Sequence, residues 1–260
     1  MRTSSPDHPA DDRHVVPGRL RAAYEHAVLY YGLGLLGLIC LTWTVFAVPL
    51  YPLLPRRWGA YIGRRVIMIG FRFYLAAISI TGTCRFDLKE LDALRTMGPL
   101  IIAPNHPSLL DAVMLLSRLP DAVCVMKAEL LDNVFLGAGA RLARYIRNDS
   151  LVRIVAQAED NLRGGSQLLI FPEGTRTTRQ PVNPFKAALA GIAKRAGVPV
   201  QTVLIETDSP FLSKGWSLFR KPPMPMYYRV RLGRRFDAPT NAHAFQAELE
   251  RYFTSELGGR

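Results

Sequence analysis

The longest run of apolar positions lies near the N-terminus and follows a polar tail. Residues 1–26 are polar, mixed in charge and contain three prolines, which indicates a flexible tail. Residues 27–55 include no charged side chain, and the three prolines between Pro49 and Pro55 predict that a helix stops near Val48. As a helix, the stretch from Ala27 would be about 33 Å long, close to the hydrocarbon core of a bilayer. We therefore expect a membrane anchor at 27–55. A buried core helix is an alternative, whereas a cleaved signal peptide would have a shorter apolar region.

A second apolar segment follows directly, but charged residues interrupt it. Residues 58–80 contain Arg64, Arg65 and Arg72, a pattern that predicts an amphipathic, membrane-associated helix within residues 56–82. A helix packed on the following domain fits the same pattern. Arginines are more numerous after the apolar run than before it, which predicts a cytoplasmic location for the remainder of the chain.

From about residue 83, short strand-like apolar runs alternate with segments of helical periodicity. The expected strands are 99–103, 122–126, 167–171 and 198–205, and the expected helices are 111–119, 150–163 and 185–196. This alternation is typical of a parallel sheet with helices packed on it. We therefore predict an α/β domain at residues 83–260. Its largely parallel sheet is flanked by helices and is preceded by the membrane-anchoring helix and the amphipathic helix.

The charge balance narrows the choice of partners. The chain has 33 basic and 21 acidic residues, a net charge of +12, which favours anionic partners such as nucleic acid, anionic lipid headgroups or CoA-type substrates. The three cysteines, Cys40, Cys84 and Cys124, are far apart and form no CxxC pair. A disulfide framework or a zinc site is therefore not expected, and a reducing, cytosolic environment fits the domain.

Two further patterns bear on the choice between lipid and nucleotide. The GxGxxG pattern at Gly32–Gly37 lies inside the apolar run, with no preceding strand, so close helix packing is expected there instead of nucleotide binding. Residues 209–236 combine seven basic side chains and no acidic one with aromatic residues such as Trp216 and Phe219. This composition suits a membrane surface, with a solvated basic face as the alternative. Nucleic acid is physically possible but would leave the anchor without a use, so we expect no nucleic-acid partner.

Candidate chemistry first appears directly after the strand expected at 99–103, in the sequence Asn105–Asp111. Pro107 suits the first position of a helix, which would place His106 at the helix entry and Asp111 one turn in. A carboxylate beside an imidazole can hold one tautomer and leave the second nitrogen free as a general base. His106 and Asp111 correspond to two of the three residues of a Ser-His-Asp arrangement, and the substrate would supply the hydroxyl in place of the serine. Considered alone, such a pair is more often a helix cap and a surface charge.

A second polar cluster, Phe171–Arg176, follows another expected buried strand. Arg176 can bind a phosphate through two N–H groups, and Gly174 lets the backbone approach a ligand closely. Glu173 can accept a hydrogen bond from a glycerol hydroxyl or orient Arg176. The alternative is a salt-bridged surface turn.

Together, the two clusters resemble the NHxxxxD and FPEGTR motifs of the glycerolipid acyltransferase family, which includes the lysophosphatidic acid acyltransferases. Both motifs are complete, and His106 and Glu173 lie 67 positions apart. Between them, residues 127–130 (KAEL) and Arg147 resemble the intermediate block of the family, although Asn133–Phe135 stands where a proline is frequent. Residues 198–200 resemble the fourth, apolar block. The resemblance covers about residues 83–240.

The resemblance implies a role for each matching residue. His106 would remove the proton of the acceptor hydroxyl, and Asp111 would orient His106. The acceptor phosphate would bind at Glu173, Gly174, Thr175 and Arg176, and Lys127 and Arg147 would add positive potential. No metal ion or bound cofactor is implied.

The function expected from this resemblance is acylation of 1-acylglycerol 3-phosphate to phosphatidic acid, at the cytoplasmic face of a membrane. The partners would be membrane lipids, a lyso-lipid acceptor and a thioester donor, either acyl-CoA or acyl carrier protein. One alternative keeps the chemistry but takes another hydroxylated lyso-lipid, such as an aminolipid or a glycolipid. Another is a non-catalytic, membrane-tethered domain that binds anionic lipid, which would need neither His106 nor Asp111.

Overall fold

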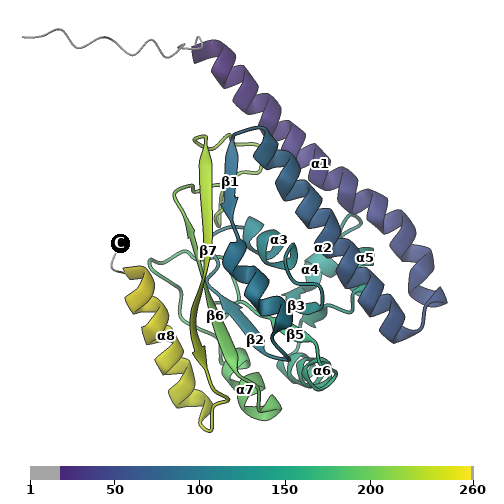
Figure 1. Ribbon diagram of the computed structural model, residues 1–260, viewed down its shortest axis with the longest axis vertical. Helices are drawn as coiled ribbons and strands as arrows, with labels where there is room; N and C mark the ends of the chain where they lie inside the picture. Colours follow the sequence, from purple (N-terminus) through teal and green to yellow (C-terminus); the bar gives the residue numbers. More distant parts are fainter. Residues whose placement is uncertain (1–17, 259–260) are drawn as a thin grey trace, which may run out of the picture.

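Seven strands form one mixed sheet, with helices on both of its faces (Figure 1). The computed structural model describes residues 18–258, and the strand order in the sheet is β1-β7-β6-β2-β5-β3-β4. Every neighbouring pair is parallel except β6 and β7, which run antiparallel. The strands are β1 (Cys84–Asp87), β2 (Ile101–Pro104), β3 (Ala122–Lys127), β4 (Ile146–Asn148), β5 (Gln167–Leu169), β6 (Val200–Thr207) and β7 (Met226–Phe236).

The centre of the sheet confirms the predicted α/β fold. Strand β2 is buried along its whole length and is paired in parallel with β5 on one side and β6 on the other. A strand buried on both faces needs a continuous apolar run, which Ile101–Ala103 supplies. The four strands expected from the sequence all form, and their ends agree with the prediction to within two residues.

Helices pack on each face of this sheet and enclose two apolar cores. One core contains side chains of α2 (Arg56–Ile80), the 3-10 helix η1 (Lys89–Thr96) and α3 (Leu110–Leu116). The other contains side chains of α6 (Leu151–Arg163), α7 (Ala187–Ala196) and α8 (Ala242–Gly258). The short helices α4 (Ala128–Leu131) and α5 (Gly137–Leu142) lie between β3 and β4 in the sequence.

The N-terminal helix α1 (Gly18–Leu53) is longer than predicted at both ends. Part of the tail expected at residues 1–26 lies outside the described residues, but residues 18–26 are helical. Contacts with distant segments explain the early start. Tyr24 donates a hydrogen bond to the carbonyl of Thr81, and Arg21 reaches Glu25 one turn on and the carbonyl of Met224. Local composition does not reveal such partners.

The other end of α1 continues through Pro49 and Pro52, where the sequence predicted a stop near Val48. Each proline removes its own N–H from the helix, and its ring crowds the carbonyl four residues earlier, although its φ angle is compatible with a helix. The last turns are held by the neighbouring domain. The guanidinium of Arg144 lies 4.4 Å from the ring centroid of Tyr51 and donates to its hydroxyl at 2.8 Å. These contacts offset the lost helical hydrogen bonds.

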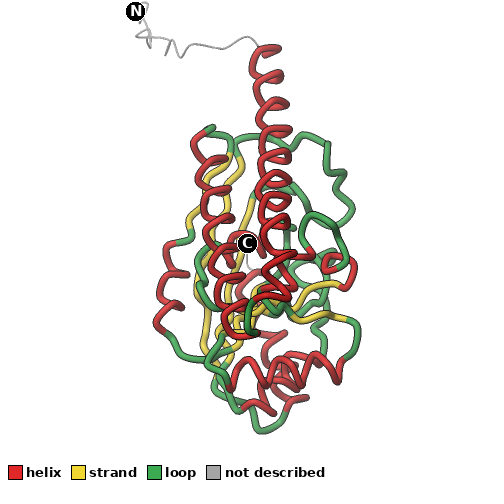
Figure 2. Tube along the Cα trace, turned by 90° about the vertical axis from the view of Figure 1, so that its right-hand side faces the viewer, coloured by secondary structure: helices red, strands yellow, loops and turns green. Residues whose placement is uncertain are grey.

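Helices α1 and α2 form an antiparallel hairpin along one side of the molecule, which Figures 1 and 2 show from two directions. The interpretation of residues 58–80 as a helix packed on the domain is confirmed, while membrane association of this helix stays a prediction. Arg64 is buried and donates to Asp121, Asn161, Ser166 and the Ala143 carbonyl, so it anchors α2 to the sheet domain. Trp58, Phe73 and Ile80 remain exposed on the outer face of the same helix.

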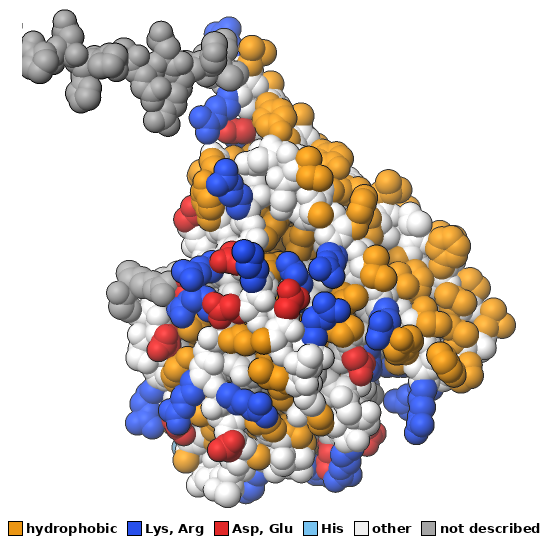
Figure 3. Space-filling model, viewed as in Figure 1, with side chains coloured by type: hydrophobic (Ala, Val, Ile, Leu, Met, Phe, Trp, Pro, Cys, Tyr) orange, Lys and Arg blue, Asp and Glu red, His pale blue; other side chains and the backbone are white. Residues whose placement is uncertain are grey.

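The outer side of the hairpin is a continuous apolar surface, visible as the hydrophobic area along the right-hand side of Figure 3. Helix α1 has the length and hydropathy of a membrane-spanning helix, and it is the one such helix within residues 18–258. Its exposed apolar side chains include Tyr30, Leu38, Leu41, Val45, Phe46 and Val48. This surface is a candidate membrane-contacting face.

Strand β7 corrects the interpretation of residues 209–236 as one basic surface segment. The second half of that segment, Met226–Phe236, is an inner strand between β1 and β6. Alternate side chains such as Tyr228 and Val230 are buried in the core, while Arg231 pairs with Glu206 on the next strand. The basic residues on alternate positions obscured this period-two pattern. The candidate membrane-contacting segment is therefore limited to the connection before β7, residues 209–225.

Candidate active site

Three loops meet where the central parallel strands end. The first motif loop, residues 105–109, follows β2, and the second motif loop, residues 170–186, follows β5. The β6–β7 loop, residues 208–225, follows β6. Because β6, β2 and β5 are adjacent and parallel, their carboxyl ends lie at one edge of the sheet, where α/β proteins build sites.

The first motif loop is a loop throughout, which corrects the expected helix start at Pro107. Helix α3 begins at Leu110, so His106 precedes it by a full turn. The Asn105 side chain holds the loop, since its amide donates to the carbonyl of Ile205 at 2.9 Å and accepts from the Ile205 N–H at 2.7 Å. Asn105 thereby extends the pairing of β2 with β6 past the last residue of β2.

His106 and Asp111 form the predicted pair. The imidazole Nδ1 lies 2.8 Å from Asp111 Oδ2, which also accepts from the Ser108 backbone N–H at 2.8 Å. Asp111 is completely buried, whereas the His106 side chain is 14% exposed. A carboxylate at Nδ1 favours the tautomer that carries its proton there, which leaves Nε2 able to accept a proton. The pair therefore has the geometry of an oriented general base.

Two surrounding features tune this pair. The ring of Phe171 stacks on the imidazole, with centroids 3.9 Å apart, and restricts its rotation. Burial raises the pKa of the Asp111 carboxyl above its usual range, while the hydrogen bonds from His106 and Ser108 oppose this shift. The two N–H donors thus support the ionised carboxylate in a buried position.

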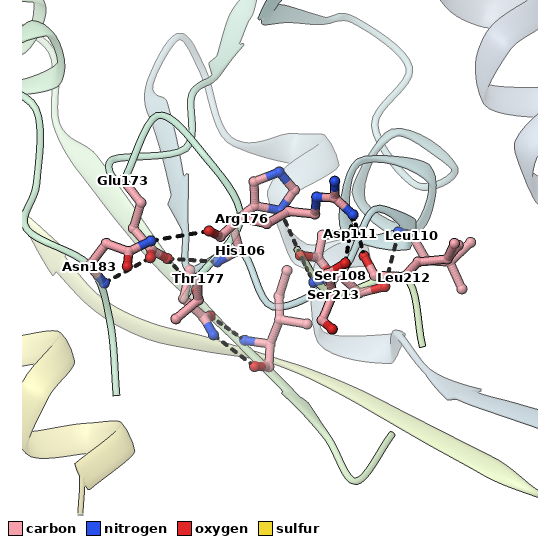
Figure 4. A network of polar contacts seen from close by, with 12 residues as sticks. His106, Ser108, Leu110, Asp111, Glu173, Arg176, Thr177, Asn183, Leu212 and Ser213 are labelled. Carbon is pink, nitrogen blue, oxygen red and sulfur yellow. Dashed lines mark hydrogen bonds and ion pairs between the residues drawn. The ribbon is translucent and has the colours of Figure 1, made fainter. Parts of the chain in front are cut away.

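Glu173 connects the two motif loops, and this role differs from the expected one. Its carboxylate is buried and accepts from the His106 backbone N–H at 3.0 Å, the Thr177 hydroxyl at 2.7 Å and the Asn183 backbone N–H at 2.8 Å. The Thr177 N–H also donates to the His106 carbonyl at 2.7 Å. With both oxygens engaged (Figure 4), Glu173 fixes the backbone of His106, and no hydrogen bond or ion pair joins its carboxylate to Arg176. This geometry therefore does not support a direct contact between Glu173 and the substrate.

Arg176 is held by backbone carbonyls instead of carboxylates. One terminal nitrogen, Nη1, donates to the carbonyls of Leu212 at 2.8 Å and Ser213 at 2.9 Å in the β6–β7 loop. In Figure 4 the side chain extends past the His106 imidazole towards these carbonyls. No ion pair within residues 18–258 neutralises its positive charge, and its remaining N–H groups are available to an anion. An arginine held in this way can bind a phosphate.

The residues before Arg176 shape the turn. Gly174 is exposed and adopts a left-handed conformation with φ of +67°, and a Cβ there would lie 3.2 Å from the Lys186 side chain. Glycine is therefore strongly favoured at this turn. Thr175 is partly exposed beside it, and no side-chain hydrogen bond from the described part of the chain engages its hydroxyl.

Lys127 and Arg147 are not joined to this network. Lys127 is exposed at the carboxyl end of β3, where helix α4 begins. Arg147 lies on the edge strand β4 and makes two 2.8 Å hydrogen bonds to Asp132 and a 3.0 Å ion pair with Asp149. Neither side chain contacts a motif loop, and the two carboxylates neutralise Arg147.

Sequence reasoning missed the residues that hold the site together. Asn105 and Asn183 belong to this group, as does the β6–β7 loop, whose Phe211 and Leu212 carbonyls accept from the Ser108 hydroxyl and the Leu109 N–H. Asn105 lies inside the first motif, but the sequence does not show that its side chain binds the backbone of Ile205. Within residues 18–258, no group of three or more His, Cys, Asp or Glu side chains is arranged to hold a metal ion.

The fold and site thus define an α/β protein that carries an Asp-oriented histidine and a carbonyl-held arginine at the carboxyl edge of its sheet. Residues 85–206 match the model of the Acyltransferase family. The match includes both motif loops and all strands from β2 to β6. This match spans a little less than half of the chain, so the acyltransferase family is the one that residues 85–206 resemble.

Curated relatives agree with this assignment. The chain is 26% identical over 198 residues to a 1-acyl-sn-glycerol-3-phosphate acyltransferase of Pseudomonas aeruginosa, covering 74% of this chain and 75% of the relative. It is 31% identical over 137 residues to the human 1-acyl-sn-glycerol-3-phosphate acyltransferase beta, covering 49% and 48%. It is also 30% identical over 116 residues to a lyso-ornithine lipid O-acyltransferase of Brucella abortus, covering 43% of each. The chain thus spans about half the length, or less, of the last two.

A solved structure extends the likeness to the N-terminal hairpin. The 1-acyl-sn-glycerophosphate acyltransferase PlsC of Thermotoga maritima matches with a TM-score of 0.62 and 16% identity. The match covers 93% of this chain and 96% of that chain. At this identity the likeness concerns the fold, which includes helices before the sheet as well as the sheet itself.

Proposed function

We propose that this acyltransferase transfers a fatty acyl chain from a thioester to the free hydroxyl of 1-acylglycerol 3-phosphate, which yields phosphatidic acid. The observation that carries the proposal is the network of His106, Asp111 and Arg176 at one sheet edge. It places a proton acceptor beside an arginine with free N–H groups. This combination suits an acceptor that carries both a hydroxyl and a phosphate.

In the proposed reaction, Nε2 of His106 takes the proton of the acceptor hydroxyl as the oxygen attacks the thioester carbonyl. A C–O ester bond forms, the C–S bond breaks, and the thiolate leaves with the proton returned from the imidazolium. Asp111 stabilises the imidazolium through Nδ1. The acyl chain passes directly to the hydroxyl, without an acyl-enzyme.

The acceptor phosphate would bind the free N–H groups of Arg176, beside the turn at Gly174 and Thr175. A phosphate there gains charge-assisted hydrogen bonds, which are stronger than neutral ones. Glu173 supports this site indirectly, because it fixes the loop that carries Arg176 to the backbone of His106. The donor, acyl-CoA or acyl carrier protein, is anionic in either form and suits the basic chain.

We propose that the apolar face of the α1–α2 hairpin attaches the enzyme to a membrane that supplies its lipid substrates. The exposed aromatic and aliphatic side chains of both helices support this attachment. The cytoplasmic orientation rests on the excess of arginines after the apolar run.

A second acceptor has a specific observation in its favour. The relative from Brucella abortus is named for acylation of a lyso-ornithine lipid, whose headgroup is an amino acid. In that case the His106 chemistry is unchanged, and Arg176 would face a carboxylate instead of a phosphate.

The test is to incubate the purified enzyme with labelled acyl-CoA and a panel of lyso-lipids, with His106→Ala alongside. The proposal predicts acylation of 1-acylglycerol 3-phosphate and loss of turnover in the variant, which should still bind membranes. Acylation of lyso-ornithine lipid alone would replace the acceptor and keep the mechanism. Equal turnover by the variant would remove His106 as the base. If no lipid reacts, the panel is repeated with acyl carrier protein as donor. The absence of product with this donor as well would favour a non-catalytic lipid-binding domain.

A further inference from the structure

The β6–β7 loop joins the active site to the N-terminal helix, a connection that the function proposed above does not use. On its inner side, the carbonyls of Phe211, Leu212 and Ser213 accept hydrogen bonds from both motif loops. Leu212 adopts a left-handed conformation with φ of +56°, unusual for a leucine. The strained backbone presents two successive carbonyls to the Arg176 guanidinium, so this loop sets the position of Arg176.

On its outer side, the same loop is docked on α1. Lys221 forms an ion pair with Glu25, and the Met224 carbonyl accepts from Arg21 at 3.2 Å. The ring of Phe219 stacks on that of Tyr30 with centroids 6.2 Å apart. Figure 1 shows the upper ends of β1 and β7 beside the upper part of α1, and the loop rejoins the sheet at this end of β7. The apolar face of α1 therefore continues onto the loop.

The tip of the loop has the composition of a membrane-contacting element. Leu218 is 44% exposed and Phe219 is 63% exposed, next to Tyr30 on α1, which is 55% exposed. Arg220 covers the ring of Trp216 at 4.6 Å, and Lys214 is exposed nearby. The whole loop after Asp208 contains no acidic residue. Apolar side chains surrounded by cations favour the surface of an anionic bilayer.

We propose that the β6–β7 loop is a membrane-contacting wall of the active site, with Leu218 and Phe219 inserted among lipid chains. The inserted tip and the Arg176 carbonyl contacts belong to one short segment. A lipid acceptor would therefore move from the bilayer along this loop to Arg176, with its phosphate near the membrane surface throughout. The continuity with the α1 face and the excess of positive charge favour a lipid surface as the occupant over a second protein.

The first test measures the position of the loop and does not depend on activity. Leu218→Cys is labelled with an environment-sensitive fluorophore and reconstituted in phosphatidylcholine–phosphatidylglycerol vesicles that contain doxyl-labelled lipids. The native cysteines, Cys40, Cys84 and Cys124, are all buried, so the label is selective. Tyr227→Cys is the matched control, because Tyr227 is also 44% exposed but lies in a surface hollow lined by charged residues.

The proposal predicts a blue-shifted emission and strong doxyl quenching at position 218, and neither effect at position 227. A label at 218 that is as exposed to water as the control would overturn the proposal. Because no substrate is present, this result stands whether or not the enzyme acylates 1-acylglycerol 3-phosphate.

The second test separates membrane contact from a purely structural role and rests on the proposed function. The double variant Leu218→Ser, Phe219→Ser is assayed with a long-chain acceptor in vesicles and with a short-chain acceptor that is monomeric in water. We expect KM for the vesicle acceptor to rise about tenfold, because two apolar side chains no longer enter the bilayer, while kcat/KM for the soluble acceptor stays unchanged. Equal losses on both acceptors would show that the tip only supports Arg176, and no loss on either would show that it has no part in acceptor delivery.

Discussion

Two arginines at the same edge of the sheet domain have opposite electrostatic surroundings. Arg176, after β5, is held by two backbone carbonyls of the β6–β7 loop. Arg147, on β4, is held by the carboxylates of Asp132 and Asp149. Carbonyl dipoles orient a guanidinium without cancelling its charge, whereas the carboxylates of Asp132 and Asp149 neutralise Arg147, with Asp149 shared by Arg153.

The difference shows that the partners of a basic residue decide whether it can bind an anion. Both arginines stand in motif-like blocks, and the sequence made both candidates for phosphate. Of the two, only Arg176 has no carboxylate partner among the described residues, and its side chain extends past the His106 imidazole (Figure 4). Five measurements test this contrast between the region after β2 and β5 and the region after β3 and β4.

The largest effect is expected for the buried carboxylate that orients the base. Asp111→Asn should lower kcat/KM by roughly 10²- to 10⁴-fold, because a neutral amide neither stabilises the imidazolium nor selects the required tautomer. Acyl transfer to 1-acylglycerol 3-phosphate measures the loss. Asp132→Asn is the control from the second region, and its activity should match that of the wild type. Equal activity of both variants would mean that Asp111 has no part in turnover.

The same substitution makes a prediction about stability. Burial raises the pKa of Asp111 in the folded protein above its unfolded value. Its contribution to stability is therefore complete below the unfolded pKa and is lost as pH rises through the folded pKa. The introduced asparagine does not titrate, and its amide group can occupy the position of Oδ1, which has no partner among the described residues. The Tm of Asp111→Asn relative to wild type should rise from acidic to neutral pH. A pH-independent difference would contradict the raised pKa.

Glu173→Gln is expected to have an intermediate effect, mainly on stability. The amide nitrogen of glutamine cannot accept hydrogen bonds, so one side of the clamp between the motif loops is lost. The free energy of unfolding should fall by about 1–3 kcal/mol, with a parallel loss of kcat as His106 becomes less well positioned. Urea unfolding in detergent micelles measures the change, and the exposed Glu129→Gln serves as control. Unchanged stability combined with a raised KM for the acceptor would instead identify Glu173 as a substrate ligand.

The smallest effects are expected in the second region. Lys127→Met and Arg147→Met should change kcat/KM for both substrates by about twofold or less, because neither side chain contacts a motif loop. Steady-state kinetics with varied donor and varied acceptor check this. A large rise in KM for the donor alone would reveal that these residues bind its phosphates.

The fold and the reacting pair were accessible from the sequence because both depend on local patterns. The buried runs around Ile101 and Leu168 predicted strands of a largely parallel sheet, and the motifs after them predicted where His106 and Asp111 lie. The supporting residues were not accessible, since Asn105 and Arg176 are held by backbone groups of segments about 100 and 36 positions away.

The N-terminal region illustrates the same limit. Composition predicted an apolar helix but not its extent, because contacts of Tyr24 with Thr81 and of Tyr51 with Arg144 stabilise its two ends. In the same way, composition left residues 58–80 as either a membrane-associated helix or a helix packed on the domain, because it could not show that the partners of Arg64 lie on the sheet domain.

The most direct test of the account compares conservative variants of the two arginines on two acceptors of equal chain length, 1-acylglycerol 3-phosphate and the corresponding monoacylglycerol. Lysine has three N–H donors on a single nitrogen, so it cannot keep the hydrogen bonds to the Leu212 and Ser213 carbonyls and also bind a phosphate through two N–H groups. Arg176→Lys should therefore lower kcat/KM for the phosphate-bearing acceptor by about 10- to 100-fold, with little change for the other. Arg147→Lys should leave both values unchanged. Equal losses on both acceptors in Arg176→Lys, or a phosphate-specific loss in Arg147→Lys, would contradict the assignment of Arg176 as the phosphate-binding residue.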